Sequence, residues 1–546
     1  MRIRNIAAII PVLLTAAVLT AADARRPTDA AADRVRAHIE FLSSDLLQGR
    51  EAGSPGYEIA AEYVAAQFRQ LGLTPAGDTG SFFQKVPLLS YRNSDRGSVT
   101  LRGTGDRSIA LAFGDEYLPG RFPVAGTRTV TGLLAFAGFG VVAPERKLDA
   151  YGDLDVKGKI VVVMSGAPVD IPSEERAYYM STRNKRAEAA RRGAIGMVVV
   201  NTPEEDQRTH FSDGARTWDT WSMTWRQANG DPFDPVPTVP VLAGLSSIAG
   251  EKLFQGAPKT FHEVSTLAEA KDGPELPHFP LPWSLDAKLS IETKPVESRN
   301  VAGMIPGRDP AVKDEVVVLS AHLDHVGVTA PVNGDAINNG ALDNAAGIAT
   351  TIEVARMMTT AERGPRRSVL LLAVTAEEKG LIGADYFARN PTVPGERIVA
   401  NVNLDMPILR YDFTDVVAFG AERSTIGDAV RRAARRVNLT LAPDPLPQEG
   451  LFVRSDHYRF VEAGVPAVFL MTGFANGGEK QFSEFLSTCY HKPCDDTSQK
   501  LDYRAGAKFA QINYEIAREL ADAPARPSWK PGDFFGTKFG RRPTPR

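Results

Sequence analysis

Apolar residues in the second half of the chain come in short continuous runs that polar segments separate. Three such runs, at 316–319, 368–374 and 398–404, consist mainly of Val, Ile, Leu and Ala. Runs of this length without strict alternation predict strands that are buried on both faces, as in parallel sheets. Residues 348–358 instead place apolar side chains at helical spacing, which predicts an amphipathic helix. The pattern is typical of an α/β fold.

The N-terminal part of the chain predicts helices before it predicts strands. Residues 31–44 and 57–71 repeat apolar positions at helical spacing, and the turn formers of 49–56 (GREAGSPG) separate them. From about residue 120 the pattern changes to short β-rich runs. Residues 157–166, a charged helix and residues 195–202 form a predicted β-α-β unit without ligand-like residues at its strand ends. An inserted domain without chemistry of its own is therefore expected here.

These patterns divide the chain. The polar, proline-containing stretch 260–282 is interpreted as the linker back to the main domain. The loop 217–234 holds Trp218, Trp221 and Trp225, which we interpret as a packed loop, with a protein-contact surface as the alternative. The predicted segments are an export signal at 1–24, an N-terminal part of the main domain at 25–119, the insert at 120–267, the main domain at 268–522 and a tail at 523–546.

The first residues predict export. Arg2 and Arg4 precede a short apolar run at 6–19, and Ala22-Asp23-Ala24 offers a small-residue cleavage site. Cleavage after Ala24 would deliver the mature chain to the periplasm or the exterior; an uncleaved anchor helix is the alternative. No later run is long enough for a bilayer span, so no membrane contact is expected after signal removal.

Composition narrows the class of partner. The chain has 546 residues, of which 43% are hydrophobic, so it can bury more than one sizeable core. Its formal charge of −3 is near balance, and no basic stripe stands out. This composition gives no argument for nucleic acid or an anionic membrane as a partner. A peptide or small-molecule substrate fits better, and the oligomeric state is left open.

The two cysteines lie close together in the string TCYHKPCDD. Cys489 and Cys494 can form a disulfide in an oxidising compartment, and the closed loop would restrict the conformation of His491. A thiolate metal pair and two free thiols are the alternatives. The spacing matches no established zinc motif.

Acidic residues and histidine follow the predicted strands where other proteins place Gly or Asn. His322 and Asp324 end the first run, Glu377 and Glu378 follow the second, and Asp405 ends the third. The carboxyl ends of parallel strands meet at one edge of a sheet, where open α/β folds keep their sites. Hard, charged side chains gathered at such an edge predict a metal site with two ions.

Each of these residues has an expected role. Asp324 is two positions from His322 and can accept the ring N–H that does not face the metal, while His325 is expected to face away and to be structural. Asp343 stands in the LDNAAG loop before a helix, where it could bridge two cations or merely cap the helix. Glu378 is assigned to a metal, and the adjacent Glu377 to proton transfer from the attacking water to the leaving amine.

Counting charge tests this set. Asp343, Glu378 and Asp405 contribute three negative charges, and neutral His322 and His491 contribute none, which leaves one net positive charge against two divalent ions. A pair of metals lowers the pKa of a shared water and polarises the carbonyl that is attacked, which is the chemistry of a paired-metal hydrolase. Histidine and carboxylate ligands without thiolates suit zinc, with cobalt or manganese as possible substitutes.

At this point the chain resembles a known family, the co-catalytic dizinc exopeptidases, which include bacterial leucyl aminopeptidases and the glutamate carboxypeptidases. The match covers most of the mature chain. In chain order the motifs are His322-Leu323-Asp324, Asp343 to Gly347, Glu377 to Gly383, Asp405-Met406, Ser455-Asp456-His457 and Tyr490-His491.

The resemblance implies a fold and a site. The fold is a mixed, largely parallel central sheet flanked by helices, with the β-rich insert as a protease-associated (PA) domain that in relatives sits over the site and restricts access. Two zinc ions are implied, with His322 and Asp405 on one, Glu378 and His491 on the other, and Asp343 between them. Further implied roles are Glu377 as the general base, Asp324 as the group that orients His322, Tyr490 as a donor to the oxyanion, and Ser455, Asp456 and His457 as lining of the pocket.

The sequence thus predicts an exported metallopeptidase that removes a residue from a peptide end, in the first place the N-terminal one. A carboxypeptidase or dipeptidase, or a cyclising transferase, on the same scaffold is the nearer alternative. A non-catalytic, receptor-like homologue is the more distant one, since such relatives lose metal ligands that this chain keeps.

Overall fold

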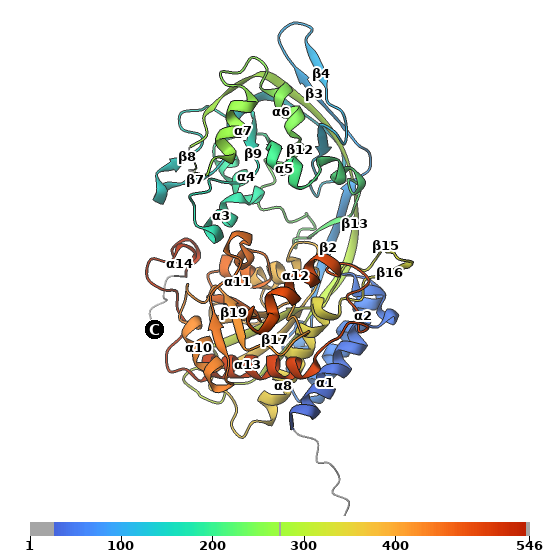
Figure 1. Cartoon of the computed structure of the whole chain (residues 1–546), viewed down its shortest axis with the longest axis vertical. Coiled ribbons are helices and arrows are strands. Elements are labelled where there is room, and N and C mark those ends of the chain that lie inside the picture. Colours follow the sequence, from blue (N-terminus) through green and yellow to red (C-terminus); the bar gives the residue numbers. More distant parts are fainter. Residues whose placement is uncertain (1–26, 272, 274, 542–546) are drawn as a thin grey trace, which may run out of the picture.

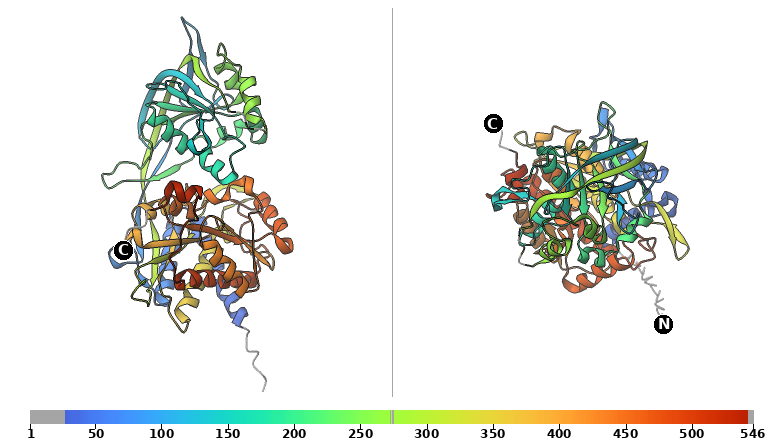
Figure 2. Two further views of the ribbon diagram at one scale, coloured as in Figure 1. Left: turned by 90° about the vertical axis from the view of Figure 1, so that its left-hand side faces the viewer. Right: turned by 90° about the horizontal axis from the view of Figure 1, so that it is seen from above.

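The computed structural model describes residues 27–271, 273 and 275–541. The chain forms two parts, one above the other in Figure 1, and the long strands β2 (Phe83–Asn93) and β13 (His278–Ile305) run from one into the other. The side view shows the same two parts joined along one edge by these strands (Figure 2). The predicted export signal lies outside the described residues. Among the described helices, none is both long and apolar enough to cross a bilayer.

The lower part is built on a mixed sheet whose centre is parallel. β14 (Val316–His322) lies between β17 (Ser368–Val374) and β18 (Ile398–Leu404), and all three strands are parallel. β21 (Ala467–Thr472) continues the parallel order beyond β18. β13 and β19 (Asp415–Phe419) border this parallel group as antiparallel neighbours. The predicted mixed, largely parallel sheet is therefore confirmed.

Burial explains why these strands form. Every residue of β14, β17, β18 and β21 is buried, so their sequences need no polar alternation. Helices α1 (Pro27–Leu42), α8 (Ala346–Thr360), α10 (Ile426–Arg436) and α13 (Tyr503–Asp522) pack on one another beside the sheet. α11 (His457–Glu462) packs on α9 (Ile382–Arg389) and on β18 and β21. The sheet thus has the flanking helices that the sequence predicted.

The N-terminal helices are fixed by local signals. α2 (Pro55–Gln70) is capped by Ser54, whose side chain accepts a hydrogen bond from the Tyr57 amide, and Pro55 is its first residue. It packs on β13 through a buried apolar face. The turn formers that precede it place Gly49 at φ +69°, where a side chain would collide with the backbone of Asn338 and Gly327. This segment therefore lies against the loops of the lower part.

The upper part has its own sheet and its own core. β6 (Gly126–Ala137), β9 (Ile160–Met164), β10 (Gly196–Val200) and β12 (Val241–Leu245) are parallel neighbours in this order. α4 (Thr182–Arg191) connects β9 to β10, which is the predicted β-α-β unit. The predicted loop at 217–234 contains a strand, β11 (Ser222–Trp225), which pairs with β2. Trp225 is buried and stacks on Phe233, whereas Trp218 and Trp221 are only partly buried.

The predicted linker at 260–282 is wrong in detail. The structure has a helix, α7 (Phe261–Glu269), in which Thr260 and Glu263 form a capping box, and β13 already begins at His278. Phe279, Leu281, Trp283 and Leu285 are buried, so every second residue of this proline-containing stretch faces the core of the upper part. Proline is tolerated here because the pairing of β13 with β6 is interrupted between Pro280 and Ser284.

Candidate metal centre

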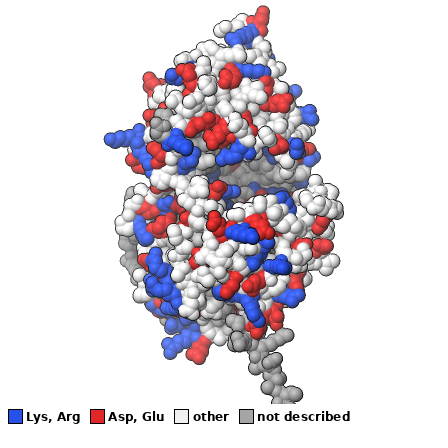
Figure 3. Space-filling view, viewed as in Figure 1, with Lys and Arg blue, Asp and Glu red and all other residues white. Residues whose placement is uncertain are grey.

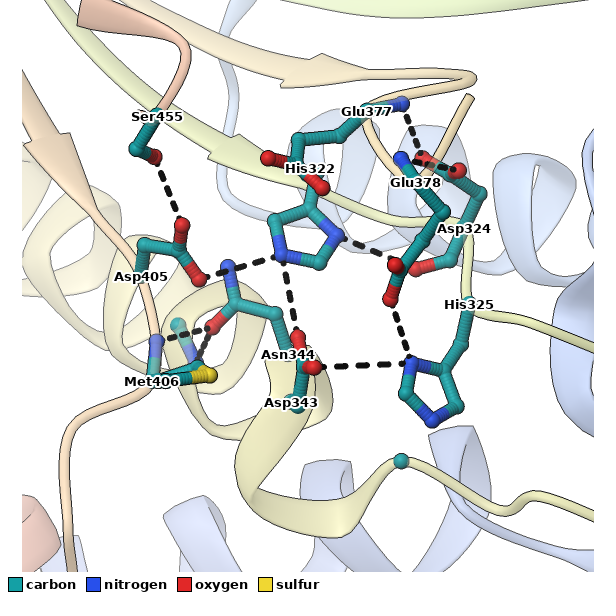
Figure 4. A network of polar contacts seen from close by, with 12 residues as sticks. His322, Asp324, His325, Asp343, Asn344, Glu377, Glu378, Asp405, Met406 and Ser455 are labelled. Atoms are coloured by element: carbon teal, nitrogen blue, oxygen red, sulfur yellow. Dashed lines mark hydrogen bonds and ion pairs between the residues drawn. The ribbon is translucent and has the colours of Figure 1, made fainter. Parts of the chain in front are cut away.

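The central strands bring the predicted ligands to one edge of the sheet. His322 ends β14, Glu377 and Glu378 follow β17, and Asp405 follows β18. Because these strands are parallel neighbours, their carboxyl ends lie side by side. Asp343 comes from the π-helical turn η5 (Ala341–Ala345), which leads directly into α8. Figure 4 shows these side chains pointing toward one another.

Asp343 stands in the middle of this arrangement. Its Oδ1 is 3.2 Å from Nε2 of His322, and its Oδ2 is 3.2 Å from Nε2 of His491. The same His322 nitrogen is 3.1 Å from Oδ1 of Asp405, and the same His491 nitrogen is 3.1 Å from Oε2 of Glu378. Two groups of donor atoms therefore share one carboxylate, and each group consists of one imidazole nitrogen and carboxylate oxygens.

The donor set fits divalent metal ions of the zinc class. Ligand atoms of His322, Asp343 and Glu378 all lie within 4.8 Å of one another. The side chains of Asp343 and Glu378 are 3% and 4% exposed, a degree of burial at which carboxylates require compensating positive charge. Imidazole nitrogens and carboxylate oxygens are the ligands that zinc takes in catalytic sites.

Electrostatics in the centre separate the two adjacent glutamates. Burial would raise the pKa of Glu378, but hydrogen bonds from His325 and His491 lower it to about 2. Burial raises the pKa of Glu377 well above its ordinary value, and the nearby Asp405 adds to this effect. Glu378 is thus held as a charged carboxylate, whereas Glu377 favours binding a proton.

The neighbouring carboxylates raise the pKa values of the two histidines in the centre. Burial would lower the pKa of His491, but its hydrogen bonds to Asp343 and Glu378 raise it to about 10. Burial likewise opposes a charge on His322, yet Asp405 and Glu377 raise its pKa well above the ordinary value. Without metal, protons on these rings therefore supply the positive charge that the buried carboxylates need.

Asp324 orients the centre in a different way from the predicted one. Nδ1 of His322 lies 3.1 Å from the backbone carbonyl oxygen of Asp324, not from its carboxylate. The carboxylate instead accepts hydrogen bonds from the amides of Glu377 and Glu378, at 3.1 and 3.3 Å. The chain leaves the extended conformation after His322, so the carbonyl turns toward the ring and the side chain reaches the neighbouring loop.

His325 does not face away from the site, which corrects the expectation from strand alternation. Its Nδ1 lies 2.8 Å from Oε1 of Glu378 and 3.8 Å from Oδ2 of Asp343 (Figure 4). Alternation does not apply because β14 ends at His322. His325 therefore contacts two of the predicted ligands directly.

The Ser455-Asp456-His457 motif is divided by the structure. Ser455 lines the cavity at the metal centre and donates a hydrogen bond of 2.6 Å to Oδ2 of Asp405. Asp456 and His457 do not line that cavity and are fully buried behind it. Their predicted role as pocket lining is wrong, because α11 begins at His457 and turns both side chains into the interior.

Tyr490 and His491 lie in the loop that the cysteines close. Cys489 and Cys494 are joined by a disulfide. The ring of Tyr490 stacks on that of His491, with centroids 3.8 Å apart, and both line a cavity of about 580 Å3 at the metal centre. Burial raises the pKa of Tyr490, and the nearby Asp343 and Glu378 raise it further, so its hydroxyl keeps its proton.

Two buried residues that support the centre escaped the sequence analysis. Asp495 accepts hydrogen bonds from the amides of Leu342 and Asp343, both at 3.0 Å. Arg50 is 1% exposed and donates to the carbonyl oxygens of Leu323 and Gly340, at 3.0 and 3.1 Å. Their positions in the sequence could have indicated them, because Arg50 stands within the GREAGSPG turn and Asp495 directly follows Cys494.

Comparison with known proteins agrees with this geometry. Residues 300–517 match the sequence model described as peptidase family M28, and residues 130–253 match that described as the PA domain. Residues 300–517 therefore belong to peptidase family M28. The M28 match contains all five predicted metal ligands and Glu377, and the PA match lies within the upper part.

Relatives of this M28 peptidase include named aminopeptidases. The chain is 24% identical over 514 residues to the probable lipoprotein aminopeptidase LpqL of Mycobacterium tuberculosis, which covers 90% of this chain and 85% of that protein. It is 24% identical over 447 residues to aminopeptidase NAALADL1 of Mus musculus, covering 69% of this chain and 53% of that protein. It thus spans about half the length of that relative and of a probable zinc metalloprotease from Pyricularia oryzae, of which 51% is covered.

A solved structure shows the same fold. The aminopeptidase from Aneurinibacillus sp. strain AM-1 superposes with a TM-score of 0.50 at 20% identity, covering 94% of this chain and 98% of that one. The fold of that protein therefore extends over both parts of the molecule.

Proposed function

We propose that this M28 peptidase is a zinc-dependent aminopeptidase with a dinuclear metal centre. The observation that carries the proposal is the position of Asp343, whose two carboxylate oxygens face His322 and His491 separately. A carboxylate placed between two sets of ligands is suited to bridge two cations. The named aminopeptidases among the relatives favour the N-terminal residue of a peptide as the one removed.

The ligands are assigned from these contacts. His322 and Asp405 would hold one zinc ion, Glu378 and His491 the other, and Asp343 both. When bound, such a pair polarises the carbonyl of the scissile bond and lowers the pKa of water. Cobalt or manganese could replace zinc at this donor set.

The remaining side chains would perform the proton transfers and the positioning. Glu377 lines the cavity, a position that suits a carboxylate that accepts a proton from the attacking water and returns it to the leaving amine. Asp324 holds the amides of Glu377 and Glu378 and so fixes the separation of their roles. Tyr490 keeps its proton and can donate a hydrogen bond to the oxyanion of the tetrahedral intermediate.

Export and domain bounds are part of the proposal. The N-terminal sequence pattern supports cleavage after Ala24 and a periplasmic or secreted location, and the disulfide between Cys489 and Cys494 fits an oxidising compartment. We place the inserted PA domain at 120–267, between segments 25–119 and 268–522 of the peptidase domain and before a tail at 523–546.

Hydrolysis of leucine p-nitroanilide tests the activity. The purified chain should release nitroaniline, an excess of chelator should abolish the release, and added zinc should restore it. Activity that persists in excess chelator would refute a metal-dependent mechanism.

Substitution of the adjacent glutamates tests the roles. Glu377→Gln should keep both zinc ions and lose turnover by several powers of ten, because proton transfer assists both halves of the reaction. Glu378→Gln is the matched comparison and should lose zinc. Zinc content and single-turnover rates distinguish the two; loss of zinc in Glu377→Gln would show that the assignment is reversed.

A further inference from the structure

A second cavity touches the loop that carries Glu377 and Glu378. It has a volume of about 210 Å3 and lies between the inserted domain and the peptidase domain. Lys379 and Gly380 line this cavity, whereas Glu377 lines the cavity at the metal centre. Segment 377–380 therefore contributes to the walls of both cavities. The groove between the two parts of the molecule is visible in the space-filling view (Figure 3).

The lining of this cavity is rich in positive charge. It contains two carboxylates, Asp234 and Asp385, and the latter already pairs with Arg389 at 3.0 Å. The cationic side chains come from both domains and are five in number: Arg121, Arg183, Arg186, Lys379 and Arg459.

These cations have fewer carboxylate partners than they need. Glu462 serves two of them, since Arg183 lies 3.3 Å and Arg459 2.8 Å from its carboxylate. Nε of Arg459 is buried without a hydrogen-bond partner among the described residues. The remaining ion pairs join Arg186 to Asp234 at 2.7 Å and Lys379 to Glu51 at 2.9 Å.

Arg121 has no ion pair among the described residues. Its guanidinium donates only to uncharged groups, including the carbonyl oxygens of Thr220 at 3.0 Å and Thr217 at 2.7 Å. Burial lowers the pKa of Arg121, so its charge is held at a cost that a bound anion would offset. The cavity therefore holds an excess of guanidinium groups, and planar guanidinium groups bind carboxylates well.

We propose that this cavity binds the terminal carboxylate of a short peptide substrate, on the C-terminal side of the scissile bond, through Arg121 and the Arg183–Arg459 pair. This inference rests on the proposed aminopeptidase function. Because segment 377–380 lines both cavities, a substrate with its N-terminal side chain in the larger cavity and its scissile bond at Glu377 would extend along this segment. That direction leads to the basic cavity. The small volume limits the peptide beyond the scissile bond, so the enzyme acts best on dipeptides and other very short peptides.

The test compares substrates that differ only in the carboxylate. For the zinc-loaded wild-type enzyme, kcat/KM for leucyl-alanine should exceed that for leucyl-alanine amide at least tenfold, mainly through a lower KM. Arg121→Gln should remove this preference, Arg121→Lys should keep part of it, and the loss should be confined to substrates that carry the carboxylate, with leucine p-nitroanilide as the reference. The control is Arg102→Gln, which should keep the preference. Arg102 is the last residue of β3 (Ser98–Arg102), its side chain is 56% exposed, and it pairs with Asp286.

Two results would overturn the proposal. One is equal kcat/KM for the acid and the amide in the wild type, and the other is an unchanged preference in Arg121→Gln. Leucyl-glutamyl amide has a side-chain carboxylate but an amidated C-terminus. If it is cleaved as efficiently as leucyl-alanine, the cavity binds a side-chain carboxylate, and the assignment to the chain terminus is wrong.

A binding measurement that needs no hydrolysis tests the carboxylate site independently of the proposed aminopeptidase activity. N-acetyl-alanine has the carboxylate but no free amino group, and its binding to the zinc-loaded protein can be followed by ligand-observed NMR. Wild type should bind it more tightly than its amide, and Arg121→Gln should not. If the wild type hydrolyses no peptide, the aminopeptidase proposal fails, and this binding result still decides for or against the cavity.

Discussion

Asp495 shows how a single buried side chain can set the geometry of a metal centre. Its two carboxylate oxygens accept hydrogen bonds from the amides of Leu342 and Asp343, within the turn η5 that carries the Asp343 carboxylate. Groups that orient ligands typically change metal affinity by about 10–100-fold when they are removed. Asp495 also follows Cys494, so it connects the loop of His491 to the loop of Asp343.

We therefore expect Asp495→Asn to weaken zinc binding by at least about tenfold while the fold is kept, because an amide has one acceptor oxygen where the carboxylate has two. Competition with a chromophoric chelator measures the affinity, and circular dichroism reports the fold. Asp496→Asn is the matched control, since the Asp496 carboxylate accepts hydrogen bonds from the nearby Ser498 and from no other described residue. Equal affinities in the two variants would contradict this role.

His457 predicts how stability depends on pH. Its side chain is fully buried beside the rings of Phe452 and Phe469, and this burial lowers its pKa from 6.5 to about 3. Between these values the unfolded chain binds more protons than the folded one, so stability falls as pH falls below 6.5. At pH 5 this residue lowers the free energy of unfolding by about 2 kcal/mol relative to neutral pH.

His457→Phe should therefore lose less unfolding free energy than the wild type between pH 7 and pH 5. Urea denaturation at both values measures the difference. His262→Gln serves as a control because His262 is exposed, and it should follow the wild type. The same pH dependence in all three proteins would show that His457 is not the responsible group.

At the scale of elements, a helix of the PA domain supports a wall of the metal-centre cavity. α3 (Ser173–Met180) packs on the short turns η7 (Pro447–Glu449) and η8 (Leu451–Val453) of the peptidase domain. Glu449 and Leu451 of these turns line the cavity. The PA domain therefore contributes to the shape of the site through this contact.

Arg423 holds this contact together. It forms ion pairs with Glu174 of α3 and, at 3.0 Å, with Asp533 near the C-terminus, and it lies over the ring of Phe452. Arg423→Ala would leave two buried carboxylates unpaired and should lower the free energy of unfolding by about 3–5 kcal/mol. The KM for leucine p-nitroanilide should also rise, because η8 loses its support.

Urea denaturation and steady-state kinetics measure the two effects of Arg423→Ala. Arg431→Ala is the control, since among the described residues Arg431 pairs only with Asp428, and both side chains are 53% exposed. Its expected change in stability is within about 0.5 kcal/mol. Similar stability of the two variants would rule out the proposed support by Arg423.

For the whole molecule, the sequence predicted those features that depend on an unbroken run of apolar residues, namely the central strands and the residues that follow them. Buried strands followed by charged residues gave the sheet and the order of the candidate ligands, because β14, β17 and β18 are buried along their whole length. The alternation in β13 was masked by prolines, so a strand of 28 residues was interpreted in part as a linker. Local spacing predicted side-chain direction only while the chain stayed extended, which is why His325 and Asp324 differ from expectation.

Other features of the whole molecule depend on contacts between residues far apart in the sequence, which no short sequence pattern predicts. The gathering of cationic residues from both domains in one cavity follows from how the domains pack. No linear motif joins Arg121 to Arg459. The supporting contacts of Arg50 and Asp495 likewise depend on backbone groups far away in the sequence.

The central claim is that this molecule holds two metal ions through one shared carboxylate. Calorimetric titration of the metal-free protein with zinc tests it directly. The account predicts two zinc ions per chain in the wild type, and loss or strong weakening of at least one of them in Asp343→Ala. Saturation at one zinc ion per chain in the wild type, or two ions bound with unchanged affinity in Asp343→Ala, would contradict it.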